Sequence, residues 1–154
     1  MKISVRKIAM GLVLVSAFIL AACGGASGGA AGGPLDVGTD GENLAYAPAA
    51  LTAKAGEKVT INFKNNSSAQ SHNFIVVKGG DDVAMAVDES AAEAGDATGY
   101  IPADTSNIVA NTALLAPGAS ETIEFTPAEA GTYTFICTYP GHYGGGMKGV
   151  LTVN

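Results

Sequence analysis

The chain has 154 residues and a net charge of −6, with 14 acidic and eight basic side chains. Three of the basic residues, Lys2, Arg6 and Lys7, lie at the N-terminus, so only five remain in the rest of the chain. This length suits one ordinary domain with flanking segments, and the acidic balance argues against nucleic acid and anionic lipid headgroups as partners.

The N-terminus is predicted to be an export signal. After the three basic residues comes an apolar run of 13 residues, Ile8 to Leu20, whereas a bilayer span needs about 20. The following Leu20-Ala21-Ala22-Cys23 resembles a bacterial lipobox. We therefore expect residues 1–22 to be a lipoprotein signal peptide and Cys23 to carry lipid. The alternatives are an ordinary secreted protein or an uncleaved anchor helix.

Residues 23–33 are predicted to form a flexible tether, because Gly24 to Gly33 contain only Gly, Ala and Ser. Residues 34–154 would then form one domain, exported and held by its lipid to the membrane, facing the periplasm or the cell exterior. In such a compartment an unpaired cysteine, here Cys137, needs a chemical explanation.

Alternating apolar and polar residues predict several half-buried strands within that domain. Turn sequences rich in Gly, Asn, Ser and Pro separate them. The clearest strand patterns lie at residues 59–64, 122–126, 132–137 and 149–154. We expect an all-β, Greek-key β-sandwich.

One segment departs from this pattern. Residues 81–94 are rich in Ala and Glu and predict a short helix, with Asp82 as the candidate cap at its start and Gly95 at its end. The helix belongs to an insertion of roughly residues 79–113. We expect Met85, within it, to fill the core.

Four residues from two distant parts of the domain predict a metal site. Cys137, His142 and Met147 fall within eleven residues, and His72 is the only other histidine of the chain. Two imidazoles, a thiolate and a weak axial methionine are the ligand set of an electron-transferring blue-copper centre. We therefore expect one type 1 copper ion per chain.

The strand period allows these ligands to meet. His72 shares its parity with Phe74, and Cys137 shares its parity with Phe135, so both ligands are expected to face the core. Pro140 and the glycines that follow it permit the turn that would return His142 and Met147 to the same point.

Each ligand taken alone has an ordinary alternative. His72 would be a hydrogen-bonded core residue, Cys137 a small buried hydrophobe, Met147 core filler and His142 a surface residue. Zinc is the main rival metal, although zinc sites rarely recruit methionine. The chain has no third histidine, so it lacks the further copper sites of a multicopper oxidase, and no hydrolytic triad is visible.

Two polar residues stand beside the ligands. Asn73 follows His72, and Thr138 follows Cys137, so either could hydrogen-bond across the two ligand segments and tune the thiolate. Ordinary turn chemistry is the alternative for both.

These motifs resemble the cupredoxins, the small blue copper proteins. His72-Asn73, Cys137-x₄-His142 and the following Met147 are similar to the azurin and auracyanin pattern, and the likeness extends to the lipobox, the tether and Tyr100-Ile101-Pro102-Ala103-Asp104. The interval from His142 to Met147 is one position longer than in azurin and similar to that in plastocyanin. Phe74 stands where the pattern carries tryptophan.

The resemblance implies a sandwich of about eight strands, no enzymatic activity, and one-electron shuttling in the electron-transport chain of a phototrophic bacterium. The implied partners are a quinol-oxidising membrane complex as donor and a reaction-centre cytochrome as acceptor. The pattern also gives Ser71 a carbonyl near copper and Asn73 a role in linking the ligand loops. Copper storage or delivery is the alternative function, although no Met-rich tract is present.

Overall fold

The computed structural model describes residues 33–154. The predicted signal peptide, Cys23 and nearly all of the tether lie outside the described residues.

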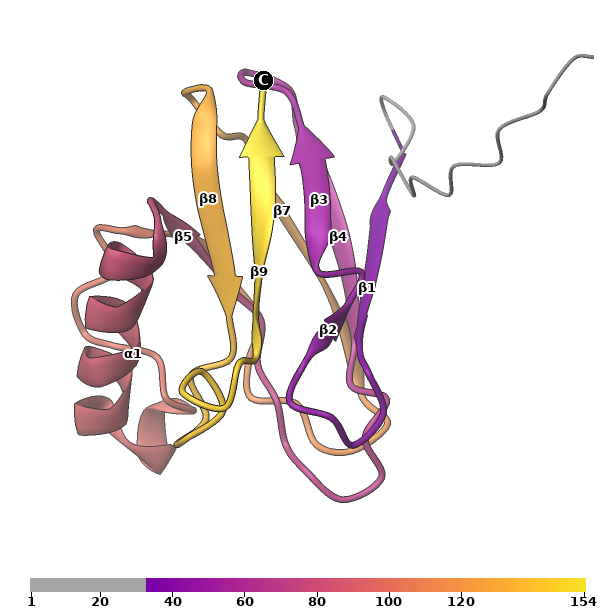
Figure 1. Cartoon of the computed structure of the whole chain (residues 1–154), viewed down its shortest axis with the longest axis vertical. Coiled ribbons are helices and arrows are strands. Elements are labelled where there is room, and N and C mark those ends of the chain that lie inside the picture. The colour runs from indigo at the N-terminus through magenta and orange to yellow at the C-terminus, as the bar shows by residue number, and fades with distance from the viewer. Residues whose placement is uncertain (1–32) are drawn as a thin grey trace, which may run out of the picture.

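Two β-sheets pack face to face in this part of the chain (Figure 1). The predicted all-β sandwich is confirmed. It has nine strands where about eight were expected, and the shortest of them, β2, has only two residues. In spatial order, the four-stranded sheet contains β2 (Tyr46–Ala47), β1 (Leu35–Thr39), β4 (Val59–Lys64) and β7 (Ser120–Phe125). The five-stranded sheet contains β3 (Ala50–Ala53), β9 (Lys148–Val153), β8 (Gly131–Ile136), β5 (Ile75–Lys78) and β6 (Ile108–Asn111).

The main core lies between the two sheets and follows the period of the strands. Phe63 from β4 and Phe135 from β8 are fully buried there, and Cys137, directly after β8, belongs to the same cluster. Phe74, just before β5, completes the centre of this layer. The parity argument for Cys137 and for the segment after His72 therefore agrees with the packing.

A second, smaller core lies on the outer face of the five-stranded sheet. Ile75, Val77 and Ile136, which have the opposite parity, pack there against α1 (Asp81–Ala94). Ala84 and Val87 supply the buried side of the helix. The helix thus covers β5 and β8, the two strands that adjoin His72 and Cys137 (Figure 1).

The helix was predicted correctly in its range but not in two of its details. Gly80, not Asp82, is the residue that caps its start, and no side chain caps the first turn. Met85 is 52% exposed and does not fill the core, because it lies on the solvent side of the helix. Gly95 does end the helix, and its N–H donates to the Ala91 carbonyl. A 3₁₀ turn, η1 (Asp96–Thr98), follows.

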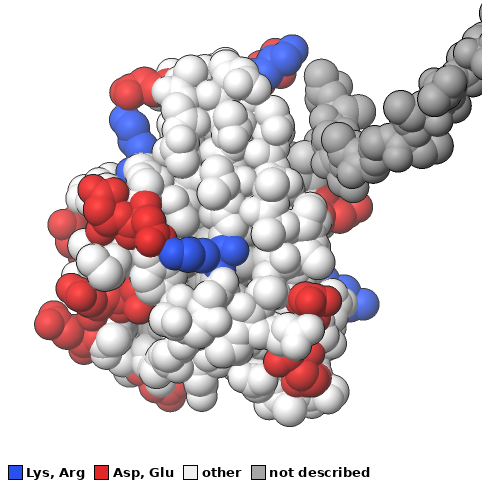
Figure 2. Space-filling view, in the orientation of Figure 1, with Lys and Arg blue, Asp and Glu red and all other residues white. Residues whose placement is uncertain are grey.

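Acidic side chains gather over the helical insertion. Figure 2 shows them on the left of the molecule, where Figure 1 places α1. The helix carries five acidic residues and no basic ones: Asp81, Asp82, Asp88, Glu89 and Glu93. Among residues 33–154, no helix is long and apolar enough to span a membrane.

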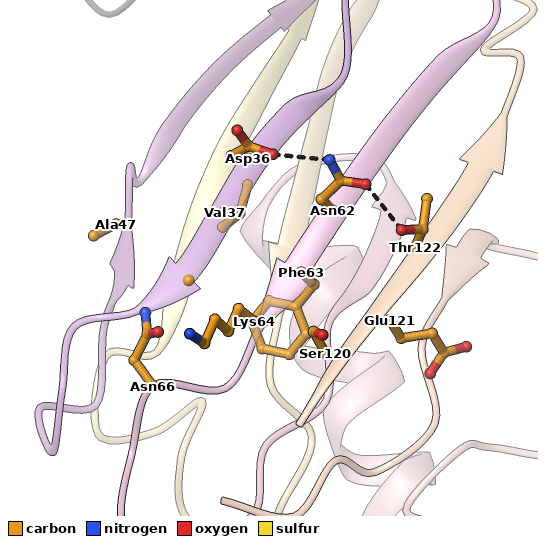
Figure 3. Close-up of a pocket in the computed structure, with 11 residues that line it drawn as sticks. Asp36, Val37, Ala47, Asn62, Phe63, Lys64, Asn66, Ser120, Glu121 and Thr122 are labelled. Atoms are coloured by element: carbon orange, nitrogen blue, oxygen red, sulfur yellow. Dashed lines mark hydrogen bonds between the residues drawn. The ribbon is translucent and has the colours of Figure 1, made fainter. Parts of the chain in front are cut away.

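The outer face of the four-stranded sheet carries an open pocket of about 460 Å³ (Figure 3). Asn62 on β4 donates to Asp36 on β1 and accepts from Thr122 on β7, both at 2.8 Å. This row of hydrogen bonds joins three strands at the pocket. The residues that line it include none of the predicted metal ligands.

Candidate metal centre

His72 precedes β5 by three residues and is held by a short bridge to Leu115. The His72 N–H donates to the Leu115 carbonyl at 3.1 Å, and the Leu115 N–H donates back at 2.9 Å. This bridge joins the His72 segment to the connection between β6 and β7. It fixes the backbone of His72 although the residue lies outside a regular strand.

The other three predicted ligands lie on the connection between β8 and β9. The Cys137 N–H donates to the Met147 carbonyl at 3.2 Å, and the Met147 N–H donates to the His142 carbonyl at 3.0 Å. These two bonds close the loop on itself. Met147 is fully buried and packs in the same core cluster as Cys137.

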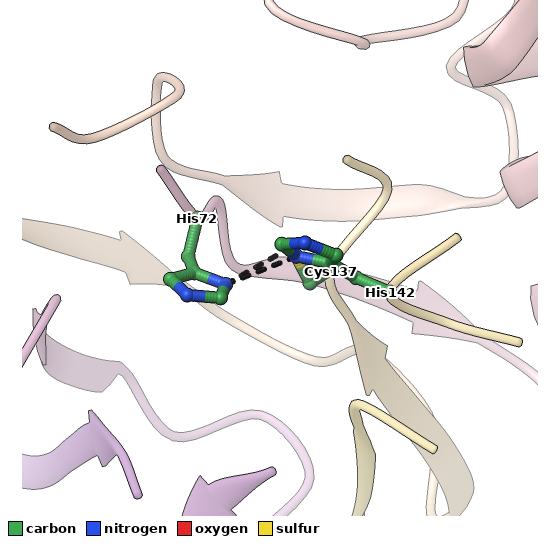
Figure 4. A group of neighbouring side chains, drawn as sticks. All are labelled: His72, Cys137 and His142. Carbon is green, nitrogen blue, oxygen red and sulfur yellow. Dashed lines mark hydrogen bonds between the residues drawn. The ribbon is translucent and has the colours of Figure 1, made fainter. Parts of the chain in front are cut away.

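Three donor atoms converge at one point (Figure 4). The Nδ1 atoms of His72 and His142 are 3.1 Å apart, and the Cys137 Sγ lies 3.8 and 3.5 Å from them, respectively. All three side chains are buried, and His142 is only 6% exposed. The predicted ligands at positions 72, 137 and 142 are therefore brought together.

This arrangement fits a metal ion. Bonds of about 2.0 Å to imidazole nitrogen and about 2.3 Å to thiolate sulfur, the values known for zinc, span ligand separations of this size. The Nε2 of His72 is buried without a hydrogen-bond partner among the described residues. A metal ion bound at Nδ1 would leave the single ring proton on Nε2. Nitrogen and soft sulfur together select copper over hard cations.

Burial shifts the proton affinity of all three ligands. The pKa of His72 falls to about 4, mainly because the side chain is buried and secondly because His142 lies beside it, while Glu42 opposes the shift. Burial also lowers the pKa of His142 and raises the pKa of the Cys137 thiol to about 11. Both imidazoles are thus neutral and ready to bind at pH 7, whereas metal binding must displace the thiol proton.

Asn73 and Thr138 connect the two ligand segments. The Thr138 N–H donates to the Asn73 Oδ1 at 2.9 Å, and the Asn73 Nδ2 donates to the Thr138 hydroxyl at 2.8 Å. Both residues are fully buried. The Thr138 hydroxyl donates in turn to the Tyr100 carbonyl at 2.6 Å, which attaches the insertion to the site. Tyr100 has a φ of 58°, unusual for a residue with a side chain.

Two further residues make contacts near the ligands that were not expected from the sequence. The Tyr46 hydroxyl donates to the Asn73 carbonyl at 2.7 Å. Glu42 accepts from the Ser67 hydroxyl at 2.7 Å and from the Ser68 N–H at 2.6 Å, which holds the loop before His72. Neither residue lies in a recognisable motif: Tyr46 belongs to the two-residue strand β2, and Glu42 lies in the irregular segment before it. The role of Ser71 stays a prediction.

The sequence matches the family model described as copper binding proteins, plastocyanin/azurin family, over residues 34–154. Auracyanin-A of Chloroflexus aurantiacus is 44% identical, and the alignment covers 100% of both chains.

Solved structures give the same picture. The dithionite-reduced auracyanin of the photosynthetic bacterium Roseiflexus castenholzii is 53% identical with a TM-score of 0.78, covering 81% of this chain and 99% of its own. The structure of auracyanin A, a "blue" copper protein from Chloroflexus aurantiacus, is 47% identical with a TM-score of 0.74, covering 79% of this chain and 100% of its own.

Proposed function

The chain belongs to the plastocyanin/azurin family of copper-binding proteins, and from this premise we propose that it shuttles single electrons between membrane-associated redox partners. It is an auracyanin-like blue copper protein, and its family consists of electron carriers rather than enzymes. The ligand set that we assign is His72, Cys137, His142 and Met147.

One observation carries the proposal: the imidazole nitrogens of His72 and His142 and the buried Cys137 sulfur lie within 4.8 Å of one another. None of these three residues lies within a strand or helix, so no single element places them together. Copper bound there would supply a one-electron couple between Cu(II) and Cu(I). The Cys137 thiolate would bind both oxidation states, and the two imidazoles would favour the oxidised one. Met147 would bind weakly and help to set the potential.

The chain holds these ligands rigidly. The bridge from His72 to Leu115, the closed loop from Cys137 to Met147 and the Asn73–Thr138 pair all fix backbone atoms next to a ligand. If the ligand geometry changes little between the two oxidation states of copper, the reorganisation energy of electron transfer is low. Burial of the ligands also keeps water from the site, which disfavours release of the metal.

We infer that electrons pass through the ring of His142. It is the ligand with the largest exposed fraction, 6%, and its ring contacts Tyr139 at a centroid distance of 4.7 Å. Tyr139 is half-buried and reaches the surface beside the exposed Pro140. A partner docked at this end would approach the metal through the rings of Tyr139 and His142, which are tilted by 41° to each other.

The relatives support a proposal for the partners and the location. Auracyanin of a photosynthetic bacterium is among the similar structures, which supports partners in photosynthetic electron transport. We propose a quinol-oxidising membrane complex as donor and a reaction-centre cytochrome as acceptor. We also propose that Cys23 is lipidated, so that the domain is exported and held at the membrane outside the cytoplasm.

A redox titration of the copper-loaded protein in the presence of a copper chelator tests this function. We expect one reversible one-electron wave, with copper retained through repeated cycles. This wave should be lost in Cys137→Ser. Transfer of copper to the chelator upon reduction would instead support the storage or delivery alternative and contradict the electron carrier.

A further inference from the structure

Asp81, the first residue of α1, contacts the segment that carries two of the four assigned ligands. Its Oδ1 accepts a hydrogen bond from the Tyr143 hydroxyl at 2.7 Å and another from the Lys148 Nζ at 2.6 Å. The Tyr143 hydroxyl also lies 3.1 Å from the Asp81 carbonyl oxygen. Tyr143 directly follows His142, and Lys148 directly follows Met147. One carboxylate therefore contacts the residue after each of these two ligands.

The anchored segment contains three consecutive glycines, residues 144–146. Gly146 has a φ of 104°, a backbone conformation that other residues rarely adopt. Two backbone hydrogen bonds close the turn: the Gly146 N–H donates to the Tyr143 carbonyl at 2.9 Å, and the Met147 N–H donates to the His142 carbonyl at 3.0 Å. Because glycine loses the most conformational freedom on folding, contacts from outside the turn have much motion to restrain.

Asp81 is itself held in place by the five-stranded sheet. Only Gly79 and Gly80 separate β5 from the helix, and the Thr134 hydroxyl on β8 donates to the Gly79 carbonyl at 2.9 Å. The helix packs on the outer face of the sheet through buried side chains such as Val87. The Asp81 carboxylate is thus attached to a packed element, at the helix terminus where a negative charge is favoured.

The contact is local in its effect. Hydrogen bonds from Lys148 and Tyr143 lower the pKa of Asp81, so the carboxylate is charged at pH 7. The Lys148 ammonium also lies 5.2 Å from the centre of the Tyr143 ring. The side chains of Lys148 and Asp81 are 41% and 64% exposed, so solvent weakens the ion pair and it adds little to the stability of the whole domain. Among the ion pairs of residues 33–154, however, only this one includes a residue next to an assigned ligand.

We propose that Asp81 is a positioning residue that anchors the segment from His142 to Met147 and thereby slows the release of copper. This inference rests on the proposed function of that site. Without the anchor, the glycine turn would open more often although the domain stays folded. The helical insertion thus gains a role, because its first residue holds a ligand segment in place.

Hydrogen exchange of the metal-free protein tests the anchor without any contribution from copper. The test compares Asp81→Ala with Asp82→Ala, since Asp82 supplies the same charge to the same first turn of the helix but makes no contact with Tyr143 or Lys148. Exchange of the amides of residues 145–147 should be faster by about two- to fivefold in Asp81→Ala, the effect expected of one exposed ion pair. It should be unchanged in Asp82→Ala, and equal exchange in the two variants would overturn the inference.

Two further readouts separate a local anchor from a general loss of stability. The copper-loaded Asp81→Ala protein should lose copper to excess chelator about two- to fivefold faster than the Asp82→Ala protein. The amides of β8, which lie in the core, should exchange at the wild-type rate in both metal-free variants. If β8 amides exchanged faster by the same factor as residues 145–147, the effect would be global and the inference would be wrong.

A second variant, Tyr143→Phe, covers the case in which Asp81→Ala does not fold. It removes both hydroxyl contacts but keeps the half-buried ring and leaves the helix unchanged. Exchange of residues 145–147 should again be faster than in the wild type. Wild-type exchange there would overturn the inference and leave the electron carrier intact, whereas a wild-type protein with no reversible one-electron wave would overturn the electron carrier and the inference with it.

Discussion

Asn73 joins the two halves of the site with a single side chain. Its amide exchanges two hydrogen bonds with Thr138 and donates a third to the Gly99 carbonyl at 3.1 Å. One residue thus connects the His72 segment, the Cys137 segment and the insertion. The sequence pointed to Asn73 and Thr138 because each follows a ligand, but it gave no sign of Gly99.

Asn73→Ala should destabilise the metal-free protein by about 1–3 kcal/mol, because the buried N–H of Thr138 loses its acceptor. Urea unfolding measures this loss. Asn62→Ala is the control, since Asn62 also makes two side-chain hydrogen bonds but on the open face of a sheet, and should cost less than about 1 kcal/mol. Equal losses in the two variants would contradict the linking role of Asn73.

The histidine pKa shifts predict a pH dependence for the metal-free protein. The unfolded chain takes up a proton on His72 near pH 6.5, whereas the folded chain does so only near pH 4. The unfolded state therefore binds more protons between these values, and the free energy of unfolding should fall as the pH drops, by up to about 3 kcal/mol. Unfolding curves across this window measure it. A flat profile would show that the imidazole is not buried in the folded state.

The ligand set was predictable because the chain has only two histidines, so few combinations had to be weighed. Tyr46 and Glu42 were not predictable. Their side chains reach the site through contacts between segments distant in sequence, and neither has a characteristic spacing from a ligand.

At the scale of elements, alternation predicted the long strands. β4, β7, β8 and β9 have six residues each, and all four were expected from the sequence. The last four residues of β8 are buried on both faces, because α1 covers its outer side. β2 and β3 were not expected, because two and four residues carry too little alternation. β6 was absorbed into the predicted insertion, since all four of its residues are half-buried and no face stands out.

The pair of β8 and β9 depends on one glycine. Gly149 lies opposite Phe135, and a Cβ built on it would fall 2.2 Å from the Phe135 ring and 2.5 Å from the Ala49 carbonyl oxygen. The ring occupies the space that a side chain would need. The buried aromatic layer beneath the ligands therefore requires glycine at this position.

Gly149→Ala should lower stability by about 1–3 kcal/mol, or prevent folding, because both Phe135 and a backbone oxygen would have to move. Thermal unfolding of the metal-free protein measures the effect. Gly144→Ala is the control, since its nearest neighbour would lie 3.8 Å from the new Cβ. If the two variants melted at the same temperature, the tight packing at Gly149 would be refuted.

At the scale of the whole molecule, the family match begins at residue 34 and ends at residue 154. The same segment contains both cores and all four assigned ligands. We therefore expect the domain to fold and bind copper without residues 1–33.

Removal of residues 1–33 should leave a soluble domain that still binds copper, whereas the full chain expressed in a bacterium should fractionate with membranes. Cys23→Ser in the full chain should abolish lipid attachment and release the protein. Fractionation after labelling with a radioactive fatty acid measures both. Copper binding lost on truncation would contradict the domain boundary, and labelled Cys23→Ser would contradict the lipidation site.

The central claim is that His72, Cys137, His142 and Met147 bind one copper ion as a blue centre. The visible and EPR spectra of the copper-loaded domain test it most directly. The account predicts an intense visible absorption from the thiolate–copper bond and a small copper hyperfine splitting, both abolished in Cys137→Ser. A pale protein with the hyperfine splitting of an ordinary Cu(II) complex would contradict it.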